Sequence, residues 1–81
     1  MNHGDKLVIA FVLCVCDAGK ERQVVEKLKA MEQVEEAFVV YGEYDVIAKV
    51  NVKELKQLDT FVTEKVRRMK DIQMTSTMIT I

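Results

Sequence analysis

Apolar residues follow two spacings along the chain, and charged or glycine positions separate the segments. From Lys6 to Cys16 almost every residue is apolar, and the segment Asp17 to Gly19 then interrupts the run. A short, continuous apolar run bounded by turn residues is typical of a buried strand. From Lys20 to about Met31 the apolar residues recur at helical spacing, which predicts an amphipathic helix. They are Val24, Leu28 and Met31.

The next two apolar runs flank a glycine. They extend over Ala37 to Tyr41 and Asp45 to Val50, with Gly42 in the turn between them. Both are rich in valine, which favours strands, and glycine permits a tight reversal, so this region is predicted to form a β-hairpin. A second helix is predicted from about Val52 to Met69, followed by a strand from Ile72 to Ile81. The apolar stripe of that helix is expected at Leu55, Leu58, Val62, Val66 and Met69.

The predicted order of elements is therefore βαββαβ. This order is the ferredoxin-like split unit of the α+β class, in which a four-stranded antiparallel sheet carries both helices on one face. We expect one domain over residues 6–81, preceded by a flexible tail over residues 1–5.

The first strand creates a packing problem, because it is apolar on both sides whereas two helices cover only one face of a sheet. A half-solvated strand would alternate with polar residues. Leaving Val8 and Val12 exposed would forgo about 1.5–3 kcal/mol each. The sequence therefore predicts a two-fold homodimer that packs sheet against sheet, of the dimeric α/β-barrel type, burying about 800 Å² or more per partner. The alternative is a thick helix layer over splayed strands.

Composition narrows the class of protein. The chain has 81 residues, of which 49% are hydrophobic and 31% charged, and its net charge is -1. We see no signal-like amino terminus and no apolar run long enough for a membrane span, so a soluble, cytoplasmic protein is expected. The near-neutral charge argues against strong binding of nucleic acid by this chain alone.

The two cysteines, Cys14 and Cys16, are neighbours on one face of the predicted strand, where an extended backbone disfavours a disulfide between them. We interpret them as reduced, buried thiols. The alternative is half of a metal site, but a zinc site needs four ligands and the single histidine, His3, lies in the predicted tail. No metal or other cofactor is expected.

Several segments together resemble the ligand-binding domain of the Lrp/AsnC family, the feast/famine transcriptional regulators. The resemblance covers nearly the whole chain, and its most specific elements are the Gly42-x-Tyr44-Asp45 turn and the pair Thr75 and Thr77. The other matching segments are Val34 to Ala37, Val40 and Tyr41, Leu55, Phe61 and Val62, Val66 to Ile72, and Ser76, Met78 and Ile79.

The resemblance implies a ferredoxin-like fold, dimers formed through the sheets, and rings of dimers that bind amino acids between dimers. Two features depart from the family pattern. Only a few residues precede the first strand, so the chain resembles the stand-alone form that lacks a helix-turn-helix, and co-assembly with full-length regulators would provide the link to transcription. The family also tends to have glycine where this chain has Asp71, although aspartate tolerates the conformation needed at a helix end.

An amino-acid ligand needs an acidic partner for its ammonium group and hydrogen-bond donors for its carboxylate. By hypothesis Asp45 binds the ammonium group, backbone amides near Gly42 and the hydroxyls of Thr75 and Thr77 bind the carboxylate, and Tyr44 lines the side-chain pocket. Each residue also has a structural explanation. Gly42 can serve the turn alone, Asp45 can cap the hairpin, and threonine suits strands in general.

Three functional classes remain open from the sequence. The first is a non-enzymatic sensor that binds an amino acid or similar metabolite and shifts the assembly state. The second is a small ferredoxin-like enzyme of the monooxygenase or isomerase type, which would need a general base or reactive polar cluster. No catalytic residue is identified here. The third is a purely structural oligomerisation module.

Overall fold

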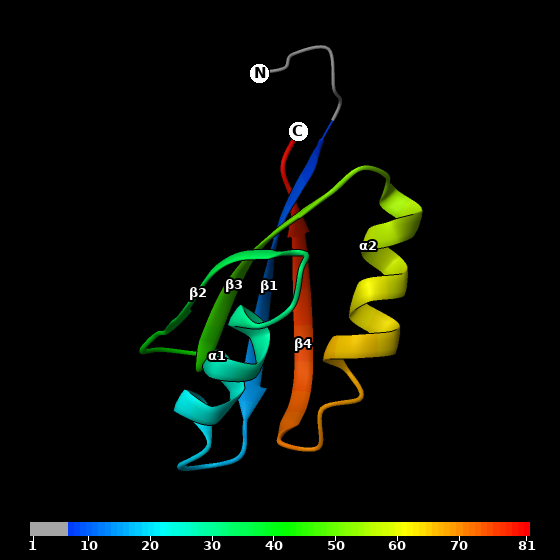
Figure 1. Cartoon of the computed structure of the whole chain (residues 1–81). Helices are drawn as coiled ribbons and strands as arrows, with labels where there is room; N and C mark the ends of the chain where they lie inside the picture. Colours follow the sequence, from blue (N-terminus) through cyan, green and yellow to red (C-terminus); the bar gives the residue numbers. More distant parts are fainter. Residues whose placement is uncertain (1–6) are drawn as a thin grey trace.

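The chain forms a four-stranded antiparallel sheet in the order β2-β3-β1-β4 with helices packed against it (Figure 1). A computed structural model describes residues 7–81; the expected tail over residues 1–5 and His3 lie outside this part. The elements are β1 (Val8–Cys16), α1 (Glu21–Lys29), β2 (Val34–Val39), β3 (Val46–Val52), α2 (Leu55–Phe61), η1 (Val62–Val66) and β4 (Ile72–Ile79). This architecture confirms the predicted ferredoxin-like fold. No helix within the described residues is long and apolar enough to cross a membrane.

The core lies between the sheet and the helices. On β1 the even-numbered residues face it, and Ala10, Val12 and Cys14 are fully buried. From α1 it receives Val24 and Leu28, both fully buried, as the helical spacing predicts. From the second helical segment it receives Leu58, Phe61 and Val66. The two helices thus cover one face of the sheet.

The prediction that Val8 and Val12 lie on the uncovered face is wrong. Val12 is fully buried and Val8 packs against the core, so the uncovered face instead carries the odd-numbered residues Ile9, Phe11, Leu13 and Val15, which are half-buried. The reason is that a strand apolar on both sides has no alternation to show which side the helices take. The packing problem itself remains, on the opposite side of the strand.

The second helix differs from the prediction of one regular helix from Val52 to Met69. It begins at Leu55, and its second part, η1, is a π-helix in which the N–H of Arg67 donates to the C=O of Val62 at 2.8 Å. The buried residues Phe61 and Val66 are separated by five positions, which matches the wider π turn. Leu55, expected in the apolar stripe, is 58% exposed.

The hairpin strands are shifted relative to the prediction. β2 begins at Val34, which pairs with Val50, and ends at Val39, whereas Tyr41 is fully exposed and outside the sheet. Residues 40–45 therefore form a longer connection than a tight reversal at Gly42.

Both cysteines are buried and unpaired with each other. Burial raises the pKa of Cys14 to about 12, with a further increase from Cys16. Burial likewise raises the pKa of Cys16 to about 11, and the nearby carboxylates, Asp45 first among them, add to the effect. The thiolate is the reactive and metal-binding form, and the raised pKa values leave little of it at neutral pH.

We predict that Leu28→Ala lowers the free energy of unfolding by about 2–5 kcal/mol, because it leaves a cavity among fully buried neighbours. The matched control is Leu55→Ala at a 58% exposed position, which we expect to change stability by about 0.5 kcal/mol or less. Urea unfolding at one fixed protein concentration measures both. Equal losses in the two variants would contradict the placement of Leu28 in the core.

We also predict that iodoacetamide alkylates the folded protein far more slowly than the unfolded protein at pH 8. A raised pKa leaves little thiolate at that pH, and burial blocks access. Mass spectrometry of samples with and without urea measures the difference, and the urea sample is the control for reagent activity. Rapid alkylation of folded protein would show that the thiols are accessible and ionised.

Candidate functional site

Asp45 directly precedes β3 and joins the turn to the neighbouring strand β1. Its N–H donates to the C=O of Cys14 at 2.8 Å, and its C=O accepts from the N–H of Val40 at 2.8 Å. Its side-chain Oδ2 accepts from the N–H of Cys16, also at 2.8 Å. The carboxylate thus takes the place of the next backbone carbonyl in the ladder between β1 and β3. It provides a structural hydrogen bond and a negative charge at the same position.

Gly42 and the two tyrosines shape the rest of the turn. Gly42 has φ +143°, a backbone conformation that side chains rarely adopt, although no atom lies within 4 Å of where a Cβ would be. Glycine is therefore required for its backbone angles and not for lack of space. Tyr44 is half-buried, whereas Tyr41 is fully exposed. The turn thus presents accessible backbone and one aromatic side chain to solvent.

Thr75 and Thr77 lie on β4, directly opposite Cys14 and Val12 of β1. Directly paired residues share one face of a sheet, so both threonines are on the side that the helices cover. Each is half-buried beside a hollow: about 340 Å³ next to Thr75 and Arg67, and about 330 Å³ next to Thr77, Leu55 and Val62. Neither hydroxyl is hydrogen-bonded to another described residue.

The structure does not bring Asp45 and the threonines together in one copy. Asp45 precedes β3, the threonines are on β4, and β1 lies between these strands. Because neighbouring strands are about 4.8 Å apart, the two groups are separated by about 10 Å across the sheet. β1 stands between the two groups, and no hydrogen bond within the described residues joins Asp45 to either threonine. Asp45 with Gly42 and Tyr44 forms one group, and Thr75 with Thr77 forms another.

Chelation of a metal ion finds no support in the described part of the chain. Among residues 7–81, no three histidine, cysteine or carboxylate side chains gather where they could hold a metal ion. The four carboxylates near Cys16, which belong to Asp45, Glu21, Asp17 and Asp71, act on its thiol through their charge.

A larger groove of about 690 Å³ lies at the other end of β3, between the α1–β2 connection and α2. Gln33 and Lys65 line it, and neither was identified from the sequence. Both are polar residues in ordinary positions, one in a connection and one on a helix, so no local pattern distinguishes them from solvated surface. Only the packing of distant segments shows that they face a common space.

Comparison with known proteins identifies the family. Residues 9–81 match the sequence model of the Lrp/AsnC ligand binding domain. An uncharacterised HTH-type transcriptional regulator of Pyrococcus abyssi is 33% identical over 72 residues, which are 89% of this chain and 46% of the relative. The chain spans about half the length of the curated relatives that it matches.

Solved structures extend the comparison. A hypothetical protein from Pyrococcus horikoshii has a crystal structure with 65% identity and a TM-score of 0.87, covering 91% of this chain and 89% of that one. AsnC of E. coli is 25% identical with a TM-score of 0.85, covering 91% of this chain and 50% of that one. The family model, the identities and the shared fold lead to one conclusion: this chain belongs to the Lrp/AsnC family and carries its ligand-binding domain over residues 9–81.

Proposed function

We propose that this chain is a cytoplasmic, non-enzymatic regulatory module that binds an amino acid or similar small metabolite where copies of the chain meet. The observation that carries the proposal is the separation of Asp45 from Thr75 and Thr77 by a whole strand. Each group has the chemistry for one end of a zwitterion, and we assign the two ends to groups on different copies. Two copies that contribute different groups would complete the site.

The chemistry of each half supports this ligand class. Of the two carboxylate oxygens of Asp45, only Oδ2 accepts a hydrogen bond from residues 7–81, so the charge and the second oxygen remain for an ammonium group. The free hydroxyls of Thr75 and Thr77 suit a carboxylate. A transcriptional regulator from Neisseria meningitidis in complex with L-Met has the same fold, at 16% identity and a TM-score of 0.81 over 91% of this chain and 49% of that one. That complex is consistent with an amino-acid ligand.

The uncovered face of the sheet supports self-association. Four half-buried apolar residues of β1 lie there, flanked by Phe38, Met74 and Met78, each more than half exposed. Large contiguous apolar patches of this kind mark interaction sites. A homodimer through this face, assembled further into a ring of dimers, would provide the copies that share the ligand. Co-assembly with full-length regulators of the family would couple occupancy to transcription.

Asp45→Asn tests ligand binding. Asparagine retains an acceptor for the N–H of Cys16 but loses the charge, so we expect a folded protein whose affinity falls by about tenfold to a hundredfold. Isothermal titration with the common amino acids measures the affinity. Glu43→Gln, a charge loss at the exposed residue two positions earlier, is the control and should bind as the wild type does.

Two results would contradict this proposal in different ways. Full affinity in Asp45→Asn would assign the aspartate to the turn alone. If the wild type gave no binding heat with any amino acid at millimolar concentration, amino acids would be excluded as its ligands.

Leu13→Glu tests the dimer. Glutamate on the uncovered face stays solvated in a single copy but would become a buried, unpaired charge between two sheets. We expect native mass spectrometry to show a multiple of 9.3 kDa for the wild type and mainly the 9.3 kDa chain for the variant. Gln23→Glu, at an exposed position of α1, is the control and should assemble normally. A wild type that is a folded monomer at micromolar concentration would refute the interface.

A further inference from the structure

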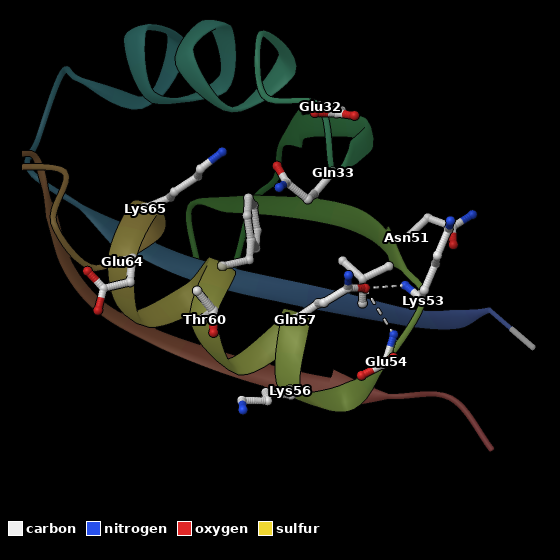
Figure 2. Close-up of a pocket in the computed structure, with 12 residues that line it drawn as sticks. Glu32, Gln33, Asn51, Lys53, Glu54, Lys56, Gln57, Thr60, Glu64 and Lys65 are labelled. Atoms are coloured by element: carbon white, nitrogen blue, oxygen red, sulfur yellow. Dashed lines mark hydrogen bonds between the residues drawn. The ribbon is translucent and has the colours of Figure 1, made fainter.

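The groove at the far end of β3 is built from segments distant in the sequence. Its walls come from the α1–β2 connection, the end of β3 and one side of α2 and η1 (Figure 2). Phe61, 2% exposed, and Val52, 7% exposed, contribute apolar surface. The other lining residues are polar or charged, and they are Glu32, Gln33, Asn51, Lys53, Glu54, Lys56, Gln57, Thr60, Glu64 and Lys65. The groove is therefore mostly polar at its rim, with a small apolar area at its base.

Gln33 contributes an acceptor that the chain leaves unused. Its Oε1 is shielded from solvent and has no hydrogen-bond partner within residues 7–81. Its backbone C=O accepts from the N–H of Asn51 at 2.9 Å, so the residue is anchored beside the groove while its amide is not. A buried acceptor without a donor is unfavourable. A small rotation of the Gln33 amide toward the groove would let a ligand donor hydrogen-bond to Oε1 and satisfy this acceptor.

Lys65 contributes a positive charge on the opposite wall. Figure 2 shows Lys65 and Gln33 extending toward the same space, whereas Glu64 points away from it. Glu64 pairs with Arg68 at 3.5 Å, and Glu54 is engaged in the capping box of α2, with Gln57 accepting from the N–H groups of Lys53 and Glu54. Among residues 7–81 Lys65 has no ion pair. Lys65 is thus a positive charge, unpaired within the described part of the chain, that faces the groove, whose lining also holds Lys53 and Lys56 and the acids Glu32, Glu54 and Glu64.

We propose that this groove is a second small-molecule site, complete within one chain, for a small organic acid that also carries an N–H or O–H donor. The carboxylate would bind Lys65, the donor would bind Oε1 of Gln33, and the carbon skeleton would lie toward Phe61. α-Amino acids and 2-hydroxy acids have this chemistry. The site does not depend on assembly and is separated from Asp45 by the length of β3, about 20 Å.

The direct test is two-dimensional NMR of the side-chain NH₂ group of Gln33. It uses the Asp45→Asn protein, because that substitution is expected to weaken ligand binding at Asp45. Pools of common L-amino acids and of their 2-hydroxy analogues are added at millimolar concentration. We expect one of them to shift the Gln33 resonance but not that of Gln23, which lies on exposed α1. For a pool member that binds, the amide and the analogue without the amino or hydroxyl group should each bind about tenfold more weakly.

Variants separate binding from folding. Lys65→Met and Gln33→Met should each weaken groove binding by about tenfold, whereas Lys70→Met, at an exposed position outside the groove, should not. Gln33→Met should also raise the melting temperature, because it removes a buried acceptor that lacks a donor. A purely structural role for Gln33 predicts the opposite change in melting temperature.

The outcomes distinguish this proposal from the proposed function. If no pool moves the Gln33 resonance, or if Lys65→Met binds as tightly as its parent, the groove site is wrong. In that case ligand binding that Asp45→Asn abolishes would leave the proposed function intact. Conversely, a ligand-induced shift of the Gln33 resonance that persists in Asp45→Asn and disappears in Lys65→Met would show binding in the groove. That result would hold whether or not the site at Asp45 binds a ligand.

Discussion

The fold depends on a central strand that is apolar on both faces. β1 lies between β3 and β4, and its even-numbered residues are sealed by α1 and α2 while its odd-numbered residues face the side without helices. Two helices are all that the βαββαβ order provides, so the chain cannot cover the second face by itself. Burying an apolar side chain is worth about 1.5–3 kcal/mol, a large fraction of the stability of a domain of this size. A partner surface on the second face would therefore stabilise the chain, and in the proposed homodimer another copy supplies it.

Asp45 connects that constraint to the candidate site. Its carboxylate accepts from the N–H of Cys16 and so continues the ladder between β1 and β3 beyond the last backbone pair. Cys16 directly follows Val15, the last residue of β1 on the uncovered face. A ligand that draws the carboxylate away would therefore strain the end of the same strand that carries the apolar face. If ligand binding changes the affinity between copies in this way, thermodynamic linkage requires that assembly through that face change the ligand affinity by the same factor.

The sequence was sufficient to predict the order of the elements and the fold, because hydrophobic period and turn residues are local signals. It could not predict which side of β1 is covered, since Val8, Val12, Phe11 and Leu13 are equally apolar. It also missed the π turn at Val62, which becomes visible only when Phe61 and Val66 are both placed in the core. Gly42 and Asp45 were candidates from the chemistry of the turn as well as from family resemblance, whereas Tyr44, Thr75 and Thr77 depended more on the resemblance. Their division into two groups follows from strand order. Gln33 and Lys65 carried no sequence signal at all.

The position of the ligand site determines which concentrations affect its occupancy. A metabolite shared by two copies stabilises the assembly by mass action, so its apparent affinity rises with protein concentration and with any interaction that brings copies together. A metabolite held by Gln33 and Lys65 within one chain has the same affinity in every assembly state, unless assembly moves the α1–β2 connection relative to η1. The first arrangement responds to both the metabolite and the amount of regulator, and the second responds to the metabolite alone. A chain with both sites would respond separately to metabolite concentration and to protein concentration, because only the shared site requires a second copy.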